Sequence, residues 1–299
     1  MEAILIRAAC FVAIIVLGYC LQRWGFFPKE AGAVLSKVVI GVTLPASVIC
    51  GYAGKVLDPS LLIVALLGFG ANVLYMVLAV LPRHHSRQTT AFDMVNISGY
   101  NIGTFTLPFV QSFLGPVALK TTTLFDTGAA LISLGGSYSA ASMVRDGSRF
   151  SLKKVARTLS HSVPFMTYLI MLVLALLHWQ LPGPVLEFAG VIANANAFLA
   201  MLMIGTSVRL ELKKEHLRRL GGLLAVRYGV AVILALTFWF LLPFGEEVRK
   251  VLTILVFSPT ASASPAWTRD LHGDVGLAST LGSVSILISV PVILLLLLV

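Results

Sequence analysis

The chain has 299 residues, of which 58% are hydrophobic and only 12% are charged. Soluble domains carry about 25% charged residues, so this composition, with a mean hydropathy of +0.93, excludes an ordinary soluble protein. The formal net charge of +9 is spread over many connecting segments, which argues against a nucleic-acid-binding protein.

Apolar runs of about 20 residues recur along the whole chain, and each is long enough to cross a hydrocarbon core of about 30 Å. We expect ten membrane-spanning helices, at residues 3–22, 31–51, 59–82, 90–113, 117–143, 162–178, 184–208, 219–243, 249–265 and 276–299. A signal peptide is the alternative for the first run, but no small-residue cleavage site is followed by a soluble domain. Strand-type alternation is absent, so we expect an all-α integral membrane protein.

Lysine and arginine lie mainly on alternate connections between these spans. One side holds Arg23, Lys29, Arg83, Arg87, Arg145, Arg149, Lys153, Lys154, Arg157, Arg209, Lys213, Lys214, Arg218, Arg219 and Arg269. The opposite side holds Arg7, Lys55, Lys120, Arg249 and Lys250. The positive-inside rule therefore places the first side in the cytoplasm and both termini outside.

The longest polar connection, residues 145–161, divides the chain into residues 1–144 and 162–299, with five spans each. Because five is odd, two halves of the same fold would lie in opposite orientations, as in the inverted repeats of many secondary transporters. Similar features recur at a constant offset, for example Trp24 and Trp179, which are 155 residues apart. We expect two inverted five-helix repeats joined by a cytoplasmic linker.

Two spans contain residues that interrupt helices. The fourth contains NISGYNIGTFTLPF, residues 96–109, and the ninth contains SPTASASPAWTRD, residues 258–270. A proline inside a helix costs about 3 kcal/mol or more, and the freed backbone groups must be buried in protein or line a wet cavity. The half-helix N-termini formed there, each with roughly +0.5 charge, favour anions. Kinks and tight packing contacts are the alternative use of such residues.

The order of these motifs resembles the auxin efflux carrier family over the entire chain. The segments that carry the resemblance are SGYNIGTFTLPFVQSFLGPVAL, ANAFLAMLMIGTSVRL and SPTASASPAW. The resemblance implies ten helices in two inverted repeats, with discontinuous fourth and ninth helices that cross at the site of a small organic anion. It also implies a bacterial-type carrier, related in fold to plant auxin carriers and to bile acid/sodium symporters. Residues 198–200 lack the proline usual in this family and the large plant loop is missing, so we carry over the substrate class and not auxin.

The residues expected to bind substrate all lie in or beside these segments. They are Asn96, Asn101, Gly103, Pro108, Asn194, Asn196, Ser258, Pro259, Ser262, Ser264 and Pro265. For Asn194 and Asn196, hydrogen bonds between helices are the commoner use.

Asp126 and Arg227 are the candidates for proton or ion coupling. A carboxylate is costly inside a membrane and usually faces a cavity or a partner, so Asp126 is the better candidate for a proton. The alternative for Asp126 is a hydrogen bond from Thr122 or Thr123. The guanidinium of Arg227 could instead pair with a substrate carboxylate, whereas Lys37 can extend its charge to the interface. We expect His84 and His85 to be solvated residues of a basic loop.

The sequence favours a carrier that moves small carboxylates by alternating access, with no cofactor and no metal. A sodium-coupled symporter or a sodium/proton antiporter on the same architecture is the alternative, and a receptor would bind ligand without transport. Catalytic motifs such as Gly-x-Ser-x-Gly or His-Glu-x-x-His are absent, so we expect no enzyme. The expected partners are the anion, a coupling proton or sodium ion, the lipid bilayer of a bacterial inner membrane, and a second copy of the chain.

Overall fold

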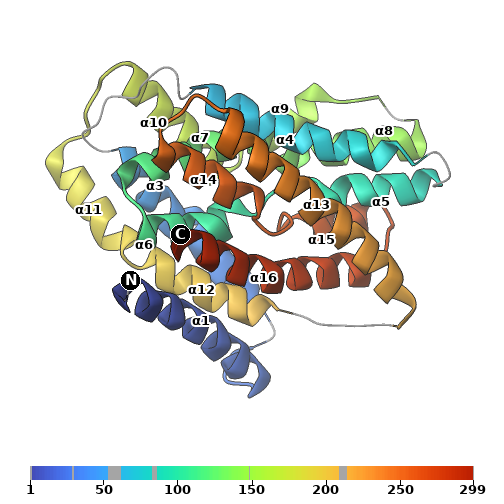
Figure 1. Ribbon diagram of the computed structural model, residues 1–299, viewed down its shortest axis with the longest axis horizontal. Helices are drawn as coiled ribbons and strands as arrows, with labels where there is room; N and C mark the ends of the chain where they lie inside the picture. The colour runs from blue at the N-terminus through green and yellow to red at the C-terminus, as the bar shows by residue number, and fades with distance from the viewer. Residues whose placement is uncertain are drawn as a thin grey trace.

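The computed structural model describes residues 2–28, 30–52, 62–82, 86–147, 149–208 and 214–298. In these residues every regular element is a helix (Figure 1), so the all-α expectation is confirmed there. An isolated antiparallel bridge joins Tyr100 to Thr260. Several residues singled out from the sequence lie outside the described ranges, namely Lys29, Lys55, Arg83, His84, His85, Arg209 and Lys213.

The first half of the chain contains helices that are repeatedly interrupted. In chain order they are α1 (Glu2–Arg23), α2 (Ala31–Val38), the π-helical turn η1 (Val39–Thr43), α3 (Leu44–Tyr52), α4 (Leu62–Val80), α5 (Arg87–Ile97), the π-helical turn η3 (Ile102–Thr106), α6 (Leu107–Phe113), α7 (Pro116–Leu131), the π-helical turn η4 (Ile132–Gly136) and α8 (Ser137–Asp146).

The second half contains longer helices together with one further interruption. They are α9 (Leu152–Ser160), α10 (Val163–Leu176), α11 (Gly183–Ala193), α12 (Asn196–Ser207), the 3-10 turn η5 (Lys214–His216), α13 (Leu217–Leu241), α14 (Glu246–Val256), α15 (Ser264–Asp270) and α16 (Val275–Leu298).

Six stretches of helix among the described residues are long and apolar enough to cross a membrane, and a seventh is formed if α9 and α10 count as one bent span. The other expected spans, 90–113, 117–143 and 249–265, fall on helices that are interrupted or short. Several apolar helices support an integral membrane protein. The count of ten stays a prediction.

The helices form two groups by their contacts. One group, the α1 group, consists of α1, α2, α3, α10, α11 and α12, and the other, the α4 group, consists of α4 to α8 and α13 to α16. In Figure 1, α1 and α12 lie at the bottom and α11 at the left edge, whereas α4, α5 and α8 lie toward the upper right.

Glycines allow the closest contacts within each group. A Cβ atom added to Gly205 of α12 would lie 2.1 Å from the Ile15 carbonyl oxygen of α1, and one added to Gly128 of α7 would lie 1.8 Å from the Ala65 carbonyl oxygen of α4. Backbones approach so closely only where a side chain is missing, which is a common way to pack membrane helices.

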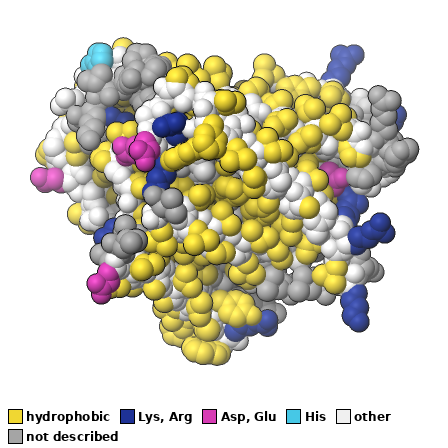
Figure 2. Space-filling model, in the orientation of Figure 1, with side chains coloured by type: hydrophobic (Ala, Val, Ile, Leu, Met, Phe, Trp, Pro, Cys, Tyr) yellow, Lys and Arg dark blue, Asp and Glu magenta, His cyan; other side chains and the backbone are white. Residues whose placement is uncertain are grey.

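The outer surface is apolar over a wide area. Large side chains such as Leu66, Ile233 and Leu295 are more than half exposed, and Figure 2 shows hydrophobic side chains over most of the visible face. Lys and Arg side chains project from the right-hand end of this view, where Figure 1 places α5 and α8. This distribution suits a bilayer around the middle of the molecule.

Residues 145–161, which we expected to form a polar connection, contain a helix. Helix α9 is capped by Ser151, whose hydroxyl accepts a hydrogen bond from the Lys154 amide at 3.2 Å. Val155 and Leu159 are buried beside Phe165, and α9 meets α10 at 82°. One apolar face is enough to hold a short helix against the protein, so the linker is partly folded.

Candidate functional site

The first interruption lies between α5 and η3. Helix α5 ends at Ile97, Ser98 is extended, and Gly99 has a φ of 82°, a left-handed conformation that favours glycine. A Cβ atom on Gly99 would also lie 2.9 Å from the Cβ of Ala261. The helix begins again at Ile102.

The second interruption lies between α14 and α15, at residues 257–263. It meets the first interruption directly, because the Asn101 amide donates to the Pro259 carbonyl at 2.9 Å beside the bridge between Tyr100 and Thr260. We call residues 98–101 and 257–263 together the junction. Two segments 160 residues apart in sequence thus share one place in the fold.

The prolines do not mark the interruptions as the sequence suggested. Pro108 lies inside the continuous helix η3–α6, directly after the π-helical turn. Pro265 lies in the first turn of α15, where a missing N–H breaks no helical hydrogen bond. Pro259 alone lies within the junction. At the first interruption the backbone leaves the helix at Ser98 and Gly99, ten residues before Pro108.

Side chains from neighbouring helices satisfy the backbone groups that the interruptions expose. Asn72 of α4 accepts from the Gly99 amide at 2.7 Å. Ser285 of α16 accepts from the Thr260 amide at 3.2 Å, and Ser289 donates to the Phe257 carbonyl at 2.6 Å. Buried backbone groups need such partners, so these side chains make the irregular backbone compatible with a membrane interior.

Arg227 of α13 forms hydrogen bonds to the backbone at both interruptions. Its guanidinium donates to the carbonyl of Ile97 at 2.6 Å and to the carbonyls of Ser258 and Pro259 at 2.8 Å each. The side chain is 1% exposed, and its Nε–H has no hydrogen-bond partner among the described residues. Arg227 therefore contacts the backbone of the junction and lines neither of the two cavities described below.

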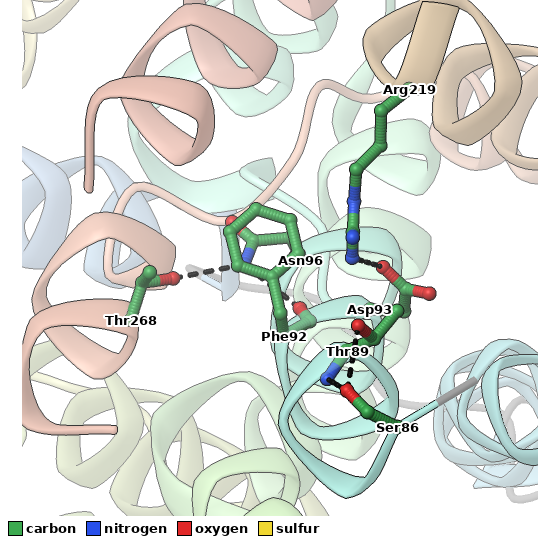
Figure 3. A network of polar contacts seen from close by, with 7 residues as sticks. All are labelled: Ser86, Thr89, Phe92, Asp93, Asn96, Arg219 and Thr268. Atoms are coloured by element: carbon green, nitrogen blue, oxygen red, sulfur yellow. Dashed lines mark hydrogen bonds and ion pairs between the residues drawn. The ribbon is translucent and has the colours of Figure 1, made fainter. Parts of the chain in front are cut away.

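A second network links α5 to α15 and α13 (Figure 3). The Asn96 amide donates to the Thr268 hydroxyl at 2.9 Å and to the Phe92 carbonyl at 2.9 Å. Asp93 forms an ion pair with Arg219 at 2.8 Å, and this arginine also stacks over the Phe92 ring at 4.9 Å. The helical segments on either side of the junction are thereby fixed to each other.

Two cavities meet at the junction. The first, which we call the Asp126 cavity, measures about 120 Å³ and is lined by Asp126, Tyr168 and Ser133 among others. The second, the serine cavity, measures about 330 Å³ and is lined by serines of α2, α12 and α16. Both include the same four junction-region residues, which are Asn101, Thr104, Ala261 and Ser262.

Both cavities lie between the two groups of helices. The Asp126 cavity is bounded by Leu44 and Tyr168 of the α1 group, and the serine cavity by Ser36 and Ser207 of the same group. The junction, which connects helices of the α4 group, lines both cavities. No Lys or Arg lines either cavity in the part of the chain that the structure describes.

Asp126 has a partner from the other half of the chain. It is partly buried and accepts a hydrogen bond from the Tyr168 hydroxyl at 2.8 Å. Thr122 and Thr123 donate elsewhere, to the backbone of their own helix and to Tyr52. The hydrogen bonds considered from the sequence for Asp126 are thus replaced by one from α10.

The first half of the chain matches a known protein family model. Residues 4–145 match a family model described as a membrane transport protein. The match covers α1 to α8 and includes the first interruption and Asp126. It points to a membrane transporter and not to an enzyme. No curated protein sequence matches the chain.

The structure divides the residues expected to bind substrate into three sets. The first set lines the cavities and consists of Asn101, Gly103, Ser262 and Pro265, with Asp126 beside them. The second set forms the hydrogen bonds that support the junction and consists of Asn96, Ser258, Pro259 and Ser264, with Arg227. The third set lines neither cavity and consists of Pro108, Asn194 and Asn196.

The two asparagines of α11 and α12 lie apart from the junction. Asn194 is exposed, while Asn196 is buried and bonds to Thr43 at 2.8 Å and to Gln111 at 3.2 Å. These contacts are hydrogen bonds between helices, the alternative use that the sequence left open.

Several residues of the site were not predicted from the sequence. Asn72 had a clear signal, since it is the one strongly polar side chain of α4. Asp93 and Arg219 lie near the first residues of the expected spans 90–113 and 219–243, where a charged side chain is common and gives no sign of a partner across the fold. Tyr168 had no signal, because a tyrosine in an apolar span is common and its partner lies 42 residues away.

Proposed function

We propose that this chain is a secondary transporter of small organic anions, with carboxylates as the substrate class, and that it belongs over its whole length to the auxin efflux carrier family. The observation that carries the proposal is the junction, where two interrupted helices meet between two cavities. Interrupted helices that meet in this way form the substrate sites of many secondary transporters.

The anion is recognised by backbone and neutral polar groups. The first N–H groups of a helix have no intrahelical partner, and those of the continuous helix η3–α6 follow Asn101 at the edge of both cavities. Together with Asn101 and Ser262 they offer donors to a carboxylate. A helix N-terminus stabilises an anion without a cationic side chain.

The position of the cavities supports the proposal of alternating access. Both reach residues next to the basic connections, for example Ser162 and Ser207. On the other side of the junction, Phe11 of α1 packs against Phe109 and Phe113 of α6, with ring centroids 5.3 and 5.4 Å apart. In this conformation the two cavities would be open toward the basic face, and the phenylalanines would close them on the opposite face. Movement of the α1 group relative to the α4 group would then close the first side and open the second.

Corresponding positions support two inverted five-helix repeats. Asn72 of α4 and Arg227 of α13 are 155 residues apart, the same offset as Trp24 and Trp179, and each bonds to the interruption in its own half. The proposal therefore includes ten spans, both termini outside, and a cytoplasmic 145–161 linker, in a bacterial inner membrane. A second copy of the chain remains a candidate partner.

A thermal-shift screen of the purified protein tests the substrate class. We expect acetate, succinate, malate or related mono- and dicarboxylates to raise the melting temperature, because a ligand that binds only the folded state stabilises it. Matched amines and neutral amides serve as controls. Stabilisation by amines and not by carboxylates would contradict the proposal.

A further inference from the structure

The carbonyl groups around Arg227 form the kind of cage that usually holds a metal cation. They come from the C-terminal end of α5 and from the segment that follows α14. Each helix C-terminus carries a partial charge of roughly −0.5, so two ends that converge need about one positive charge between them. In many transporters unwound carbonyls and half-helix C-termini coordinate the coupling sodium ion or proton.

In this protein a side chain occupies that cage. The Arg227 guanidinium reaches carbonyls of both interruptions at 2.6 to 2.8 Å. Its carbon atom also lies over the rings of Tyr75 and Tyr100, at 5.6 and 5.2 Å from the ring centroids. Aromatic faces attract cations, so carbonyl dipoles and two rings together surround the buried charge.

The charge of Arg227 is permanent. Guanidinium stays protonated in proteins, whereas a bound metal ion exchanges with the solution. Arg227 takes part in none of the ion pairs that join the described residues. The positive charge of Arg227 is therefore used to stabilise the carbonyl groups of the junction.

We propose that Arg227 is a built-in cation of the junction, which takes the place of a coupling metal ion and makes folding of the site, substrate binding and transport independent of sodium. The substrate part of this inference rests on the proposed function. The structural part does not, because the cage exists whether or not a carboxylate binds next to it. Among the coupling alternatives, this inference favours a proton over sodium.

The central test measures the melting temperature of the purified full-length protein in chloride salts of sodium, choline and guanidinium. For the wild type we expect the same melting temperature in sodium and in choline. Arg227→Ala should melt at a lower temperature and recover with millimolar guanidinium, far below denaturing concentrations. Urea, the neutral molecule of similar planar shape, should give no recovery. A sodium-dependent rise in the wild type, or equal recovery with urea, would overturn the inference.

Two further variants control for side effects. Arg219→Ala removes an arginine of the same helix that is partly exposed and pairs with Asp93, so we expect no recovery specific to guanidinium. Arg227→Lys keeps the charge and guards against an alanine variant that does not fold. Its melting temperature should not respond to sodium, and a sodium-dependent rise would count against a built-in cation.

Substrate binding provides the second arm. Coupled ions change affinity by about 5- to 150-fold, so we expect succinate and acetate to bind wild-type protein within about twofold in sodium and in choline. Affinity that is tenfold higher in sodium would overturn the inference while leaving an anion carrier in place. If neither probe binds, the proposed substrate class fails, and the melting temperatures still decide the role of Arg227.

Discussion

At the scale of single residues, Asn101 has the most direct position for contact with substrate. It borders both cavities, its side-chain oxygen accepts from the Thr104 hydroxyl at 2.5 Å, and its side-chain N–H₂ has no hydrogen-bond partner among the described residues. A hydrogen bond to a charged group contributes about 1.5–3 kcal/mol. We therefore expect Asn101→Ala to weaken carboxylate binding roughly tenfold or more, measured by titration calorimetry, with the fold retained.

The matched control for Asn101 is Asn194→Ala. Asn194 is exposed and lines neither cavity, so its removal should leave affinity unchanged. Equal affinity in wild type and Asn101→Ala would show that this side chain does not touch the anion.

We expect Asp126 to determine how carboxylate binding depends on pH. The titratable group that faces it is Tyr168, and no basic side chain in the described ranges lines its cavity. An ionised Asp126 repels an anion and a protonated one does not, so we expect affinity to rise as pH falls, by up to about tenfold per pH unit if one proton is bound.

Asp126→Asn should remove this pH dependence and bind the anion tightly at neutral pH, because the amide oxygen can still accept from Tyr168. Asp146→Asn is the control, since that carboxylate is exposed and pairs with Arg145. The same pH profile in Asp126→Asn and wild type would exclude Asp126 as the proton site.

At the scale of elements, the first interruption depends on Gly99. Its φ of 82° is costly for other residues, and a Cβ atom would lie 2.9 Å from that of Ala261. We expect Gly99→Ala to destabilise the protein by about 1–3 kcal/mol and to weaken carboxylate binding, because the two segments of the junction must separate. Circular dichroism during heating measures the first effect.

Gly70→Ala is the matched control for Gly99. Gly70 lies within α4 and has open space around it, so alanine there should be neutral or slightly stabilising. A melting temperature of Gly99→Ala equal to that of Gly70→Ala would mean that the junction tolerates a side chain at this position.

The sequence predicted that the fourth and ninth spans are interrupted, because Gly, Pro, Asn and Ser concentrate there. It could not predict where the backbone leaves the helix, since Pro108 and Pro265 are visible in sequence and the left-handed conformation of Gly99 is not. Helix α9 was missed although Ser151, Val155 and Leu159 have helical spacing. Short helices depend on tertiary packing, which composition does not show.

At the scale of the whole molecule, the all-α class followed from composition, whereas the partners across the fold did not. The bonds from Arg227 to Ile97 and from Tyr168 to Asp126 join segments 130 and 42 residues apart. Such contacts depend on how the helices pack. The grouping of helices, and with it the position of both cavities between the α1 and α4 groups, likewise required the structure.

We propose that the junction serves transport and not only binding. The measurement that tests it most directly is counterflow of a labelled carboxylate, chosen from the thermal-shift screen, into proteoliposomes preloaded with the same unlabelled compound. We expect saturable uptake that is equal in sodium and choline buffers and strongly reduced by Gly103→Leu, since a side chain there would meet Leu44, Tyr168 and Asp126 within 3.0 to 3.4 Å. Carboxylate binding without any uptake above protein-free liposomes would contradict the account and indicate a receptor.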